Sequence, residues 1–287
     1  MKISAINSSY CYVAPKGAKS FVHYSSNTGN KGIPVYNVNF AGYYTPKKLI
    51  YRLPPITDKI EYDNIIKRLL YSRTAKGHRF WSIDADNRSY KDIKAEYKGL
   101  LPYCGSDDVS FYLNGYLGGR LDKCGEFIPT EKTACDFIRV FDYSLKQLDK
   151  DFGTYSGYVY RKGYFSTRSG QYASTSESPA LAAAFQGFDA DAQYSVIKVN
   201  DAHKICDFQK SMNSQYADEE REILIDRTMK RRFVPPSEYS DSLYKIKECF
   251  ARHLVCESKI AAGYDATGEN ILSFEQAMKK IKVYEQV

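Results

Sequence analysis

The chain has 287 residues, and 41 Lys and Arg against 34 Asp and Glu give it a formal net charge of +7. With 43% hydrophobic and 26% charged residues, it has the composition of a globular protein with a substantial core, in one large domain or two small ones. Its longest apolar run, 180–185, is six residues. This is far short of the ~20 that a membrane-spanning helix needs, so such a helix is excluded.

The positive charge is concentrated at the start of the chain. The first acid is Asp58, and seven Lys or Arg precede it, so residues 58–287 carry 34 bases against 34 acids. A basic protein suggests nucleic-acid binding, but this neutral main body argues against it. Residues 1–57 contain no apolar stretch of the kind that a Sec signal peptide carries. This basic arm fits two interpretations equally: the leader of a bacterial effector delivered by contact-dependent secretion, or a loosely ordered arm that contacts a partner.

Helices are predicted mainly in the first half of the chain and near its end. Apolar residues recur at helical spacing from Tyr62 to Leu70 and again in 133–148. Near the end, helices are expected over 242–254 and 273–283, and the second opens with a Ser273/Gln276 capping box.

After Gly153 the pattern changes to short strands. Segments typical of strands are 158–160, 171–175, 194–199, 221–226 and 232–234. One short helix interrupts them, with Pro179 at its first position. The fold class is therefore α+β: a helical N-terminal region, a mostly β core and a helical C-terminal tail.

Cysteine and histidine patterns give no sign of a metal. The seven cysteines include no Cys-x-x-Cys pair, and the four histidines match no metal-ligand spacing. We expect free thiols in a reducing compartment and no metal cofactor.

Three polar features follow one another in the β-rich half: Arg161 on one strand, the hydroxyls of 174–176 on another, and Glu220 and Glu222 before an apolar run. An arginine fork binds phosphate bidentately, and hydroxyls can orient a carboxylate and contact a ribose. If Glu220 and Glu222 lie on one strand, alternation places them on the same face, about 7 Å apart. Carboxylates suit the positive charge that develops at a sugar carbon. Together the features predict a site that cleaves a nucleotide sugar.

Residues 105–240 resemble the mono-ADP-ribosyltransferases with the Arg–Ser–Glu signature, the cholera-toxin-like group. That family has an aromatic-Arg strand, then aromatic-x-Ser-Thr-Ser, then Glu-x-Glu. The matching residues here are Tyr160-Arg161, Tyr172-x-Ser174-Thr175-Ser176 and Glu220-x-Glu222. The resemblance implies a split β-sandwich ADP-ribosyltransferase core. The expected domains are a basic arm at 1–57, a helical subdomain at 58–104 and the transferase domain with its helical tail at 105–287.

The resemblance also implies NAD as the co-substrate and assigns residues to it. Arg161 would hold the NAD phosphates and the nicotinamide ribose. Lys162 stands where the family often has glycine, so the contact to the nicotinamide would come from Lys162 or Gly163. Ser174 would position the catalytic glutamate and touch the ribose. Two further residues would support the strand: Thr175 and Ser176.

Two glutamates are implied to carry the chemistry. Glu222 would bond the ribose 2′-hydroxyl and stabilise the oxocarbenium as nicotinamide leaves, and Glu220 would engage the acceptor. The segment 210–219 would present the acceptor, with Tyr216 as an aromatic contact, and 186–193 would lie near the nicotinamide and the phosphates. In this family Glu-x-Glu goes with arginine as acceptor, while a subset of bacterial effectors modifies a threonine of ubiquitin.

The expected partner is accordingly a host protein, with ubiquitin as one candidate, met in the host cytosol after secretion from a bacterium without a Sec signal. Three alternatives stay open. The first is an ADP-ribosyltransferase that acts on nucleic acid or a nucleotide, and the second is a basic-armed nucleic-acid-binding module without catalysis. A glycosidase that uses the paired acids ranks last, because it explains neither Arg161 nor the serine cluster.

Overall fold

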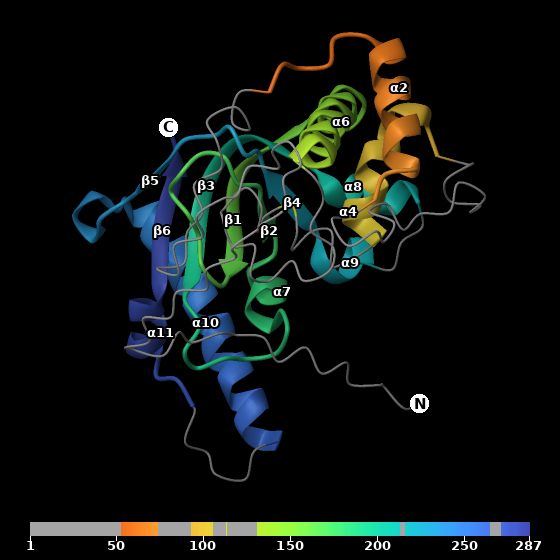
Figure 1. The fold of residues 1–287 in the computed structure, drawn as a ribbon. Helices are drawn as coiled ribbons and strands as arrows, with labels where there is room; N and C mark the ends of the chain where they lie inside the picture. Colours follow the sequence, from red (N-terminus) through yellow and green to blue (C-terminus); the bar gives the residue numbers. More distant parts are fainter. Residues whose placement is uncertain (1–52, 74–92, 106–112, 114–130, 213–215, 265–270) are drawn as a thin grey trace, which may run out of the picture.

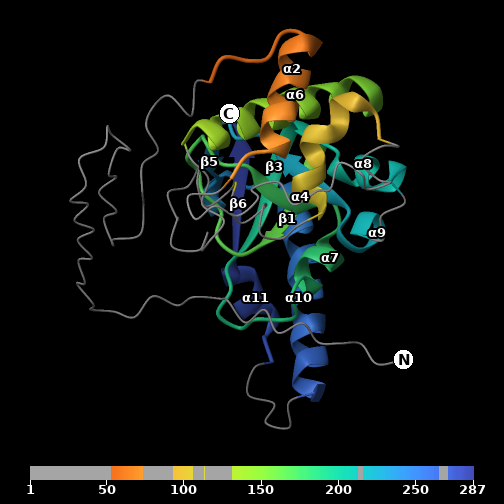
Figure 2. The same cartoon turned by 45° about the vertical axis from the view of Figure 1, so that its right-hand side comes forward.

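A computed structural model describes residues 53–73, 93–105, 113, 131–212, 216–264 and 271–287. Helices lie at both ends of a central sheet: α2, α4 and α6 at one end of the strands, and α10 and α11 at the other (Figures 1 and 2). This mixed arrangement confirms the α+β prediction. Most of the basic arm lies outside the described residues, and the predicted domain boundaries stay predictions.

The sheet has six strands. They are β1 (Thr154–Lys162), β2 (Ala173–Ser176), β3 (Tyr194–His203), β4 (Glu222–Ile225), β5 (Arg231–Phe233) and β6 (Ile281–Gln286). Their order is β1-β2-β4-β3-β6-β5, and β1 also pairs with β3. The strands β1, β2, β4 and β3 therefore close into a small barrel, and β6 and β5 extend it as an open edge. Every pair is antiparallel except β3 with β6.

The strong helical patterns of the sequence form helices. These are α2 (Lys59–Leu70), α6 (Glu131–Phe152), α7 (Pro179–Ala184), α10 (Asp241–Tyr264) and α11 (Phe274–Lys280). Asp58 caps α2 by accepting the backbone N–H of Glu61 at 2.8 Å, and Ser178 caps α7. Both bonds of the Ser273/Gln276 capping box are present at the start of α11. None of the helices within the described ranges has the length and apolar character to span a bilayer.

The C-terminal tail was predicted wrongly in part, because the helix expected over 273–283 ends at Lys280. Ile281 has extended dihedrals, φ −88° and ψ 119°, and the chain continues as β6. The β-branched Ile281 and Val283 alternate with an exposed Lys282, a period of two that suits a half-buried strand. Parallel pairing with β3 supplies the backbone hydrogen bonds that the helix would have made.

Five short helical segments among the described residues were not predicted. They are η1 (Ala95–Leu100), α4 (Leu101–Gly105), α8 (Ile205–Ser211), α9 (Tyr216–Glu220) and η4 (Pro236–Glu238). Each is three to seven residues long, too short for helical periodicity to stand out in a sequence.

The N-terminal helices share one hydrophobic core with α6 and the barrel. Tyr62 of α2 is fully buried, and its hydroxyl accepts the N–H of Gly99 at 2.9 Å and lies 2.9 Å from Ser144 Oγ on α6. A Cβ at Gly99 would lie 2.6 Å from Ser144 Oγ and 2.7 Å from the carbonyl oxygen of Val140. Only glycine therefore lets η1 pack so closely on α6, and this contact fixes the position of α4.

A buried histidine joins α6 to the barrel. His203, at the end of β3, is 4% exposed; its Nδ1 lies 2.9 Å from Asp149 on α6 and its Nε2 lies 3.3 Å from Asp226, just after β4. Burial by itself would lower the pKa of His203, but the two hydrogen-bonded carboxylates outweigh it and raise the pKa to about 9. The imidazolium is thus the form that stabilises the fold.

We predict that this histidine makes the fold sensitive to alkaline pH. Its stabilisation is complete below the unfolded-state pKa of about 6.5 and is lost as pH rises through about 9. At about 1.4 kcal/mol per pKa unit, the free energy of unfolding should fall by up to about 3 kcal/mol over that range. Denaturant unfolding at a series of pH values measures this. The His203→Gln variant should lose most of the slope, and an equally steep slope in that variant would contradict the assignment.

Candidate active site

The centre of the candidate site is the carboxyl group of Glu222. This residue opens β4 and is 4% exposed, opposite Ser176 in the register of β2 and β4. Its Oε1 accepts the hydroxyl of Tyr103 on α4 at 2.6 Å, and the hydroxyl of Ser174 on β2 also bonds it. A buried carboxylate is costly unless donors surround it, and here two different elements supply them.

Burial raises the pKa of Glu222 above its usual value. The hydrogen bonds from Ser174 and Tyr103 and the positive charge of Arg161 all act in the opposite direction. Each of these three groups stabilises the ionised form. When it is ionised, this carboxylate is poorly solvated, so it interacts more strongly with a nearby positive charge than a carboxylate in water does.

Arg161, near the end of β1, lies beside this carboxylate. Its Nε donates to the carbonyl oxygen of Tyr164 at 3.2 Å, and its Nη1 donates to that of Ser174. These bonds fix the guanidinium over the first two strands of the barrel. The structure thus brings together the three residues that the sequence singled out: Arg161, Ser174 and Glu222.

The other two hydroxyls of the serine cluster bond to backbone. The Thr175 hydroxyl donates to the carbonyl oxygen of Ile223 on β4 at 2.5 Å. The Ser176 hydroxyl donates to that of Glu220 at 2.7 Å and accepts the N–H of Ser178 at 3.1 Å. Both residues are buried and tie β2 to the segment that carries the glutamates.

Lys162 and Gly163 hold the segment 186–193 that follows α7. The Lys162 ammonium donates to the carbonyl oxygens of Phe185, at 3.1 Å, and Gly187. Gly163, at φ +94°, donates its N–H to the carbonyl oxygen of Gln193 at 2.8 Å. The left-handed backbone at Gly163 favours glycine, and it turns the chain away from β1 directly after the arginine.

The prediction that Glu220 and Glu222 share a strand face is wrong. Glu220 is the last residue of α9, and β4 begins at Glu222. Between them Arg221 adopts φ +47° and pairs with Glu177, Nε to Oε1, at 3.1 Å. Alternation along a strand therefore does not relate the two carboxylates, and Glu220 stands at the end of the segment 210–219 instead. Tyr216 begins α9, and its side chain lies outside the described residues.

Sequence reasoning missed Tyr103 and its neighbour Cys104. Tyr103 is 119 positions from Glu222 in the chain, and no pattern around it pointed to the site. Burial raises the pKa of the Cys104 thiol, and the charges of Glu222 and then Glu220 raise it further, which places this cysteine near both acids. The N-terminal helices thus contribute directly to the site.

A second arginine, Arg231 on β5, was also missed. It is 6% exposed and donates to the carbonyl oxygens of Ser166, Gln171 and Asp226, while its Nε has no hydrogen-bond partner among the described residues. Burial lowers its pKa to about 10; Asp226 opposes this shift, and the charge of Arg161 adds to it. Arg161 and Arg231 are close enough for their positive charges to repel each other. Together they create a local positive field, which suits an anion of more than one charge.

Arg161 and Arg231 could hold a nucleotide co-substrate, because their combined positive charge suits a diphosphate. No cluster of three or more His, Cys, Asp or Glu side chains with metal-binding geometry occurs in the described parts of the chain.

Comparisons with known proteins find similarity only among solved structures. No protein-family model and no curated protein matches the chain, whereas seven solved chains do. The type III effector XopAI from Xanthomonas axonopodis pv. citri has a TM-score of 0.42 and 12% identity over 80% of this chain and 84% of its own. The ADP-ribosyltransferase HopU1 of Pseudomonas syringae pv. Tomato DC3000 has a TM-score of 0.39 and 12% identity over 81% of this chain and 99% of its own.

A third match is a mutant of the eukaryotic mono-ADP-ribosyltransferase ART2.2 in complex with NAD. Its TM-score is 0.35 at 19% identity, over 62% of this chain and 72% of its own. HopU1 and ART2.2 are both ADP-ribosyltransferases.

We predict that the Tyr103 hydroxyl holds down the pKa of Glu222. The Tyr103→Phe variant removes a donor to the carboxylate, so the pKa of Glu222 should rise above its wild-type value. Carbon-13 NMR of glutamate-labelled protein measures it, with Glu222→Gln to assign the resonance. As a control, Tyr97→Phe removes a buried hydroxyl that bonds Asp151 instead and should leave the titration unchanged. Equal titration curves in wild type and Tyr103→Phe would refute the role.

Proposed function

We propose that the protein is an NAD-dependent mono-ADP-ribosyltransferase, which breaks the bond between nicotinamide and ribose and transfers ADP-ribose to a side chain of a protein. The single observation that supports this most is the buried carboxylate of Glu222, held by Ser174 and Tyr103 beside Arg161. In this grouping an anion suited to the ribose lies next to a cation suited to the diphosphate, which supports the proposal.

The proposed roles follow from charge. Arg161, with Arg231 behind it, binds the diphosphate of NAD, and Ser174 keeps the Glu222 carboxylate in one orientation. As the carbon–nitrogen bond breaks, nicotinamide leaves with the bonding electron pair, and positive charge develops on the ribose carbon. Glu222 stabilises that charge and accepts a hydrogen bond from the ribose 2′-hydroxyl. The acceptor then attacks the same carbon and loses a proton.

Supporting roles fall to the neighbours of these residues. Lys162 and Gly163 shape the backbone around the nicotinamide through their bonds to 186–193. The hydroxyls of Thr175 and Ser176 keep β2 and the glutamate segment in register. The proposed reaction uses no metal ion.

For the acceptor we propose an arginine of a host protein. Glu220 stands at the end of the segment 210–219, where a carboxylate can pair with a guanidinium and withdraw its proton. A threonine of ubiquitin is the second candidate acceptor. Five cysteines among the described residues are free thiols, which fits action in a reducing cytosol after delivery from a bacterium. An acceptor in nucleic acid, or nucleic-acid binding without catalysis, is the alternative.

The test of the activity is release of nicotinamide from NAD. Glu222→Gln keeps the shape of the side chain but removes its charge, so the rate should fall by at least about 100-fold. Glu257→Gln, on the remote helix α10, is the matched control and should retain the wild-type rate. Thermal unfolding of each variant shows whether the fold is intact. Wild-type turnover in Glu222→Gln, or no turnover in the wild type, would contradict the proposal.

The test of the acceptor role separates transfer from hydrolysis. In Glu220→Gln, labelling of lysate proteins by tagged NAD should fall at least about tenfold. Hydrolysis of NAD, measured as release of nicotinamide in the absence of an acceptor protein, should fall much less. Mass spectrometry of the labelled protein identifies the modified side chain as arginine or threonine, whereas label found on nucleic acid instead of protein would support the alternative acceptor. Parallel loss of both reactions would show that Glu220 serves the bond cleavage itself.

A further inference from the structure

A cavity lies in another part of the molecule, and none of the candidate active-site residues lines it. It has a volume of about 480 Å³ and is bounded by β5, the start of β6, and helices α10 and α11. In Figure 1 α11 lies on the side of the sheet away from α4, α8 and α9, so this cavity and the candidate active site are on different faces. About 300–1,000 Å³ is typical of pockets that bind small molecules.

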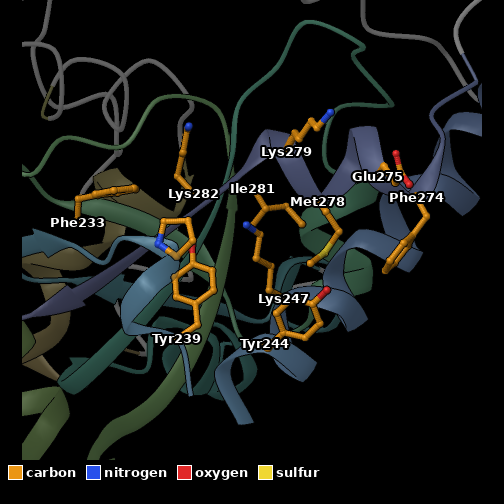
Figure 3. Close-up of a pocket in the computed structure, with 11 residues that line it drawn as sticks. Phe233, Tyr239, Tyr244, Lys247, Phe274, Glu275, Met278, Lys279, Ile281 and Lys282 are labelled. Atoms are coloured by element: carbon orange, nitrogen blue, oxygen red, sulfur yellow. The ribbon is translucent and has the colours of Figure 1, made fainter. Parts of the chain in front are cut away.

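The walls of the cavity are aromatic and its charges are positive. Rings come from Phe233, Tyr239, Tyr244 and Phe274. Three lysines line it, Lys247, Lys279 and Lys282, against a single carboxylate, Glu275. Figure 3 shows Glu275 beside Phe274 at one end of the cavity, away from Lys247.

Lys247 distinguishes this cavity from an ordinary surface hollow. The residue is 8% exposed, and Figure 3 shows its amine pointing into the cavity between Tyr239 and Ile281. The ammonium lies 5.2 Å from the centre of the Tyr239 ring, and no carboxylate of the described residues pairs with it. Burial lowers the pKa of Lys247, and the charge of Lys282 lowers it further. The stem of Lys247 is therefore buried, while its ammonium faces the cavity with no carboxylate partner among the described residues, an arrangement that favours an anion entering the cavity.

We propose that this cavity is a second ligand site, which binds a small aromatic anion, an aryl phosphate or aryl carboxylate. The ring of the ligand packs among the aromatic walls, and its anionic group pairs with Lys247. The exposed lysines Lys279 and Lys282 attract the anion at the rim. The basic arm is a poor occupant, because residues 1–57 contain no acid and seven Lys or Arg.

Phenyl phosphate is the probe, with binding to the full-length protein measured by equilibrium dialysis. Inorganic phosphate lacks the ring and benzyl alcohol lacks the charge, so each should bind at least tenfold more weakly. Lys247→Met keeps the apolar stem and should weaken phenyl phosphate at least tenfold. Lys245→Met, two residues away on α10 and outside the cavity, is the matched control and should bind within twofold of wild type.

A further variant separates this cavity from the candidate active site. Arg161→Gln should bind phenyl phosphate as the wild type does, because Arg161 is not part of the cavity. Loss of binding in Arg161→Gln with retention in Lys247→Met would overturn the proposal, as would the absence of binding to the wild type. If Lys247→Met fails to fold, a double variant of the exposed rim, Lys279→Gln with Lys282→Gln, replaces it. This variant should weaken phenyl phosphate binding at least threefold, and an unchanged affinity would overturn the proposal.

Discussion

The burial of one carboxylate constrains much of this structure. An ionised group that is 4% exposed, like Glu222, is tolerated only if donors and a positive charge surround it. Those partners come from three separate parts of the chain: Tyr103 from α4, Ser174 from β2 and Arg161 from β1. The N-terminal helices must therefore be placed accurately on the barrel, and the close packing of Gly99 on α6 does this.

A second layer of polar contacts holds the strands that carry these partners. Asp142 on α6 accepts the hydroxyl of Tyr172, which directly precedes β2, and pairs with the buried Arg227 after β4 at 2.7 Å. His203 joins the same helix to the end of β3. Helix α6 thus acts as a shared support, and the geometry around Ser174 depends on it. This explains why a 22-residue amphipathic helix precedes the arginine strand.

The sequence allowed the elements with strong periodicity to be predicted, and the structure confirms them. The stripe in α6 and the start of α7 at Pro179 are local signals, so no tertiary information was needed. The end of α11 was different, because pairing with β3 turns Ile281–Gln286 into a strand. The prediction that Glu220 lies on a strand failed for a similar reason. Arg221 adopts a left-handed conformation where the short helix α9 ends, and tertiary contacts, not the local sequence, determine that conformation. Tyr103 and Arg231 belong to the site because they contact residues that are distant in the sequence, and no local pattern predicts such contacts.

The candidate active site around Glu222 and the cavity around Lys247 differ in the sign of the charge at their centre. Around Glu222 a buried anion is already surrounded by donors, and two arginines, Arg161 and Arg231, add positive charge nearby. Around Lys247 the ammonium lies against the ring of Tyr239, and no carboxylate of the described residues pairs with it. Both arrangements favour an anion from outside, but a diphosphate suits the paired guanidiniums and a single anionic group suits the lone ammonium.

The most direct test of the account is a crystal structure of the Glu222→Gln variant with NAD, which should accumulate uncleaved co-substrate. The account predicts the diphosphate within hydrogen-bonding distance of the Arg161 guanidinium, and the nicotinamide ribose against Ser174 and the side chain at position 222. NAD bound elsewhere on the molecule, or a diphosphate with no contact to Arg161, would contradict it.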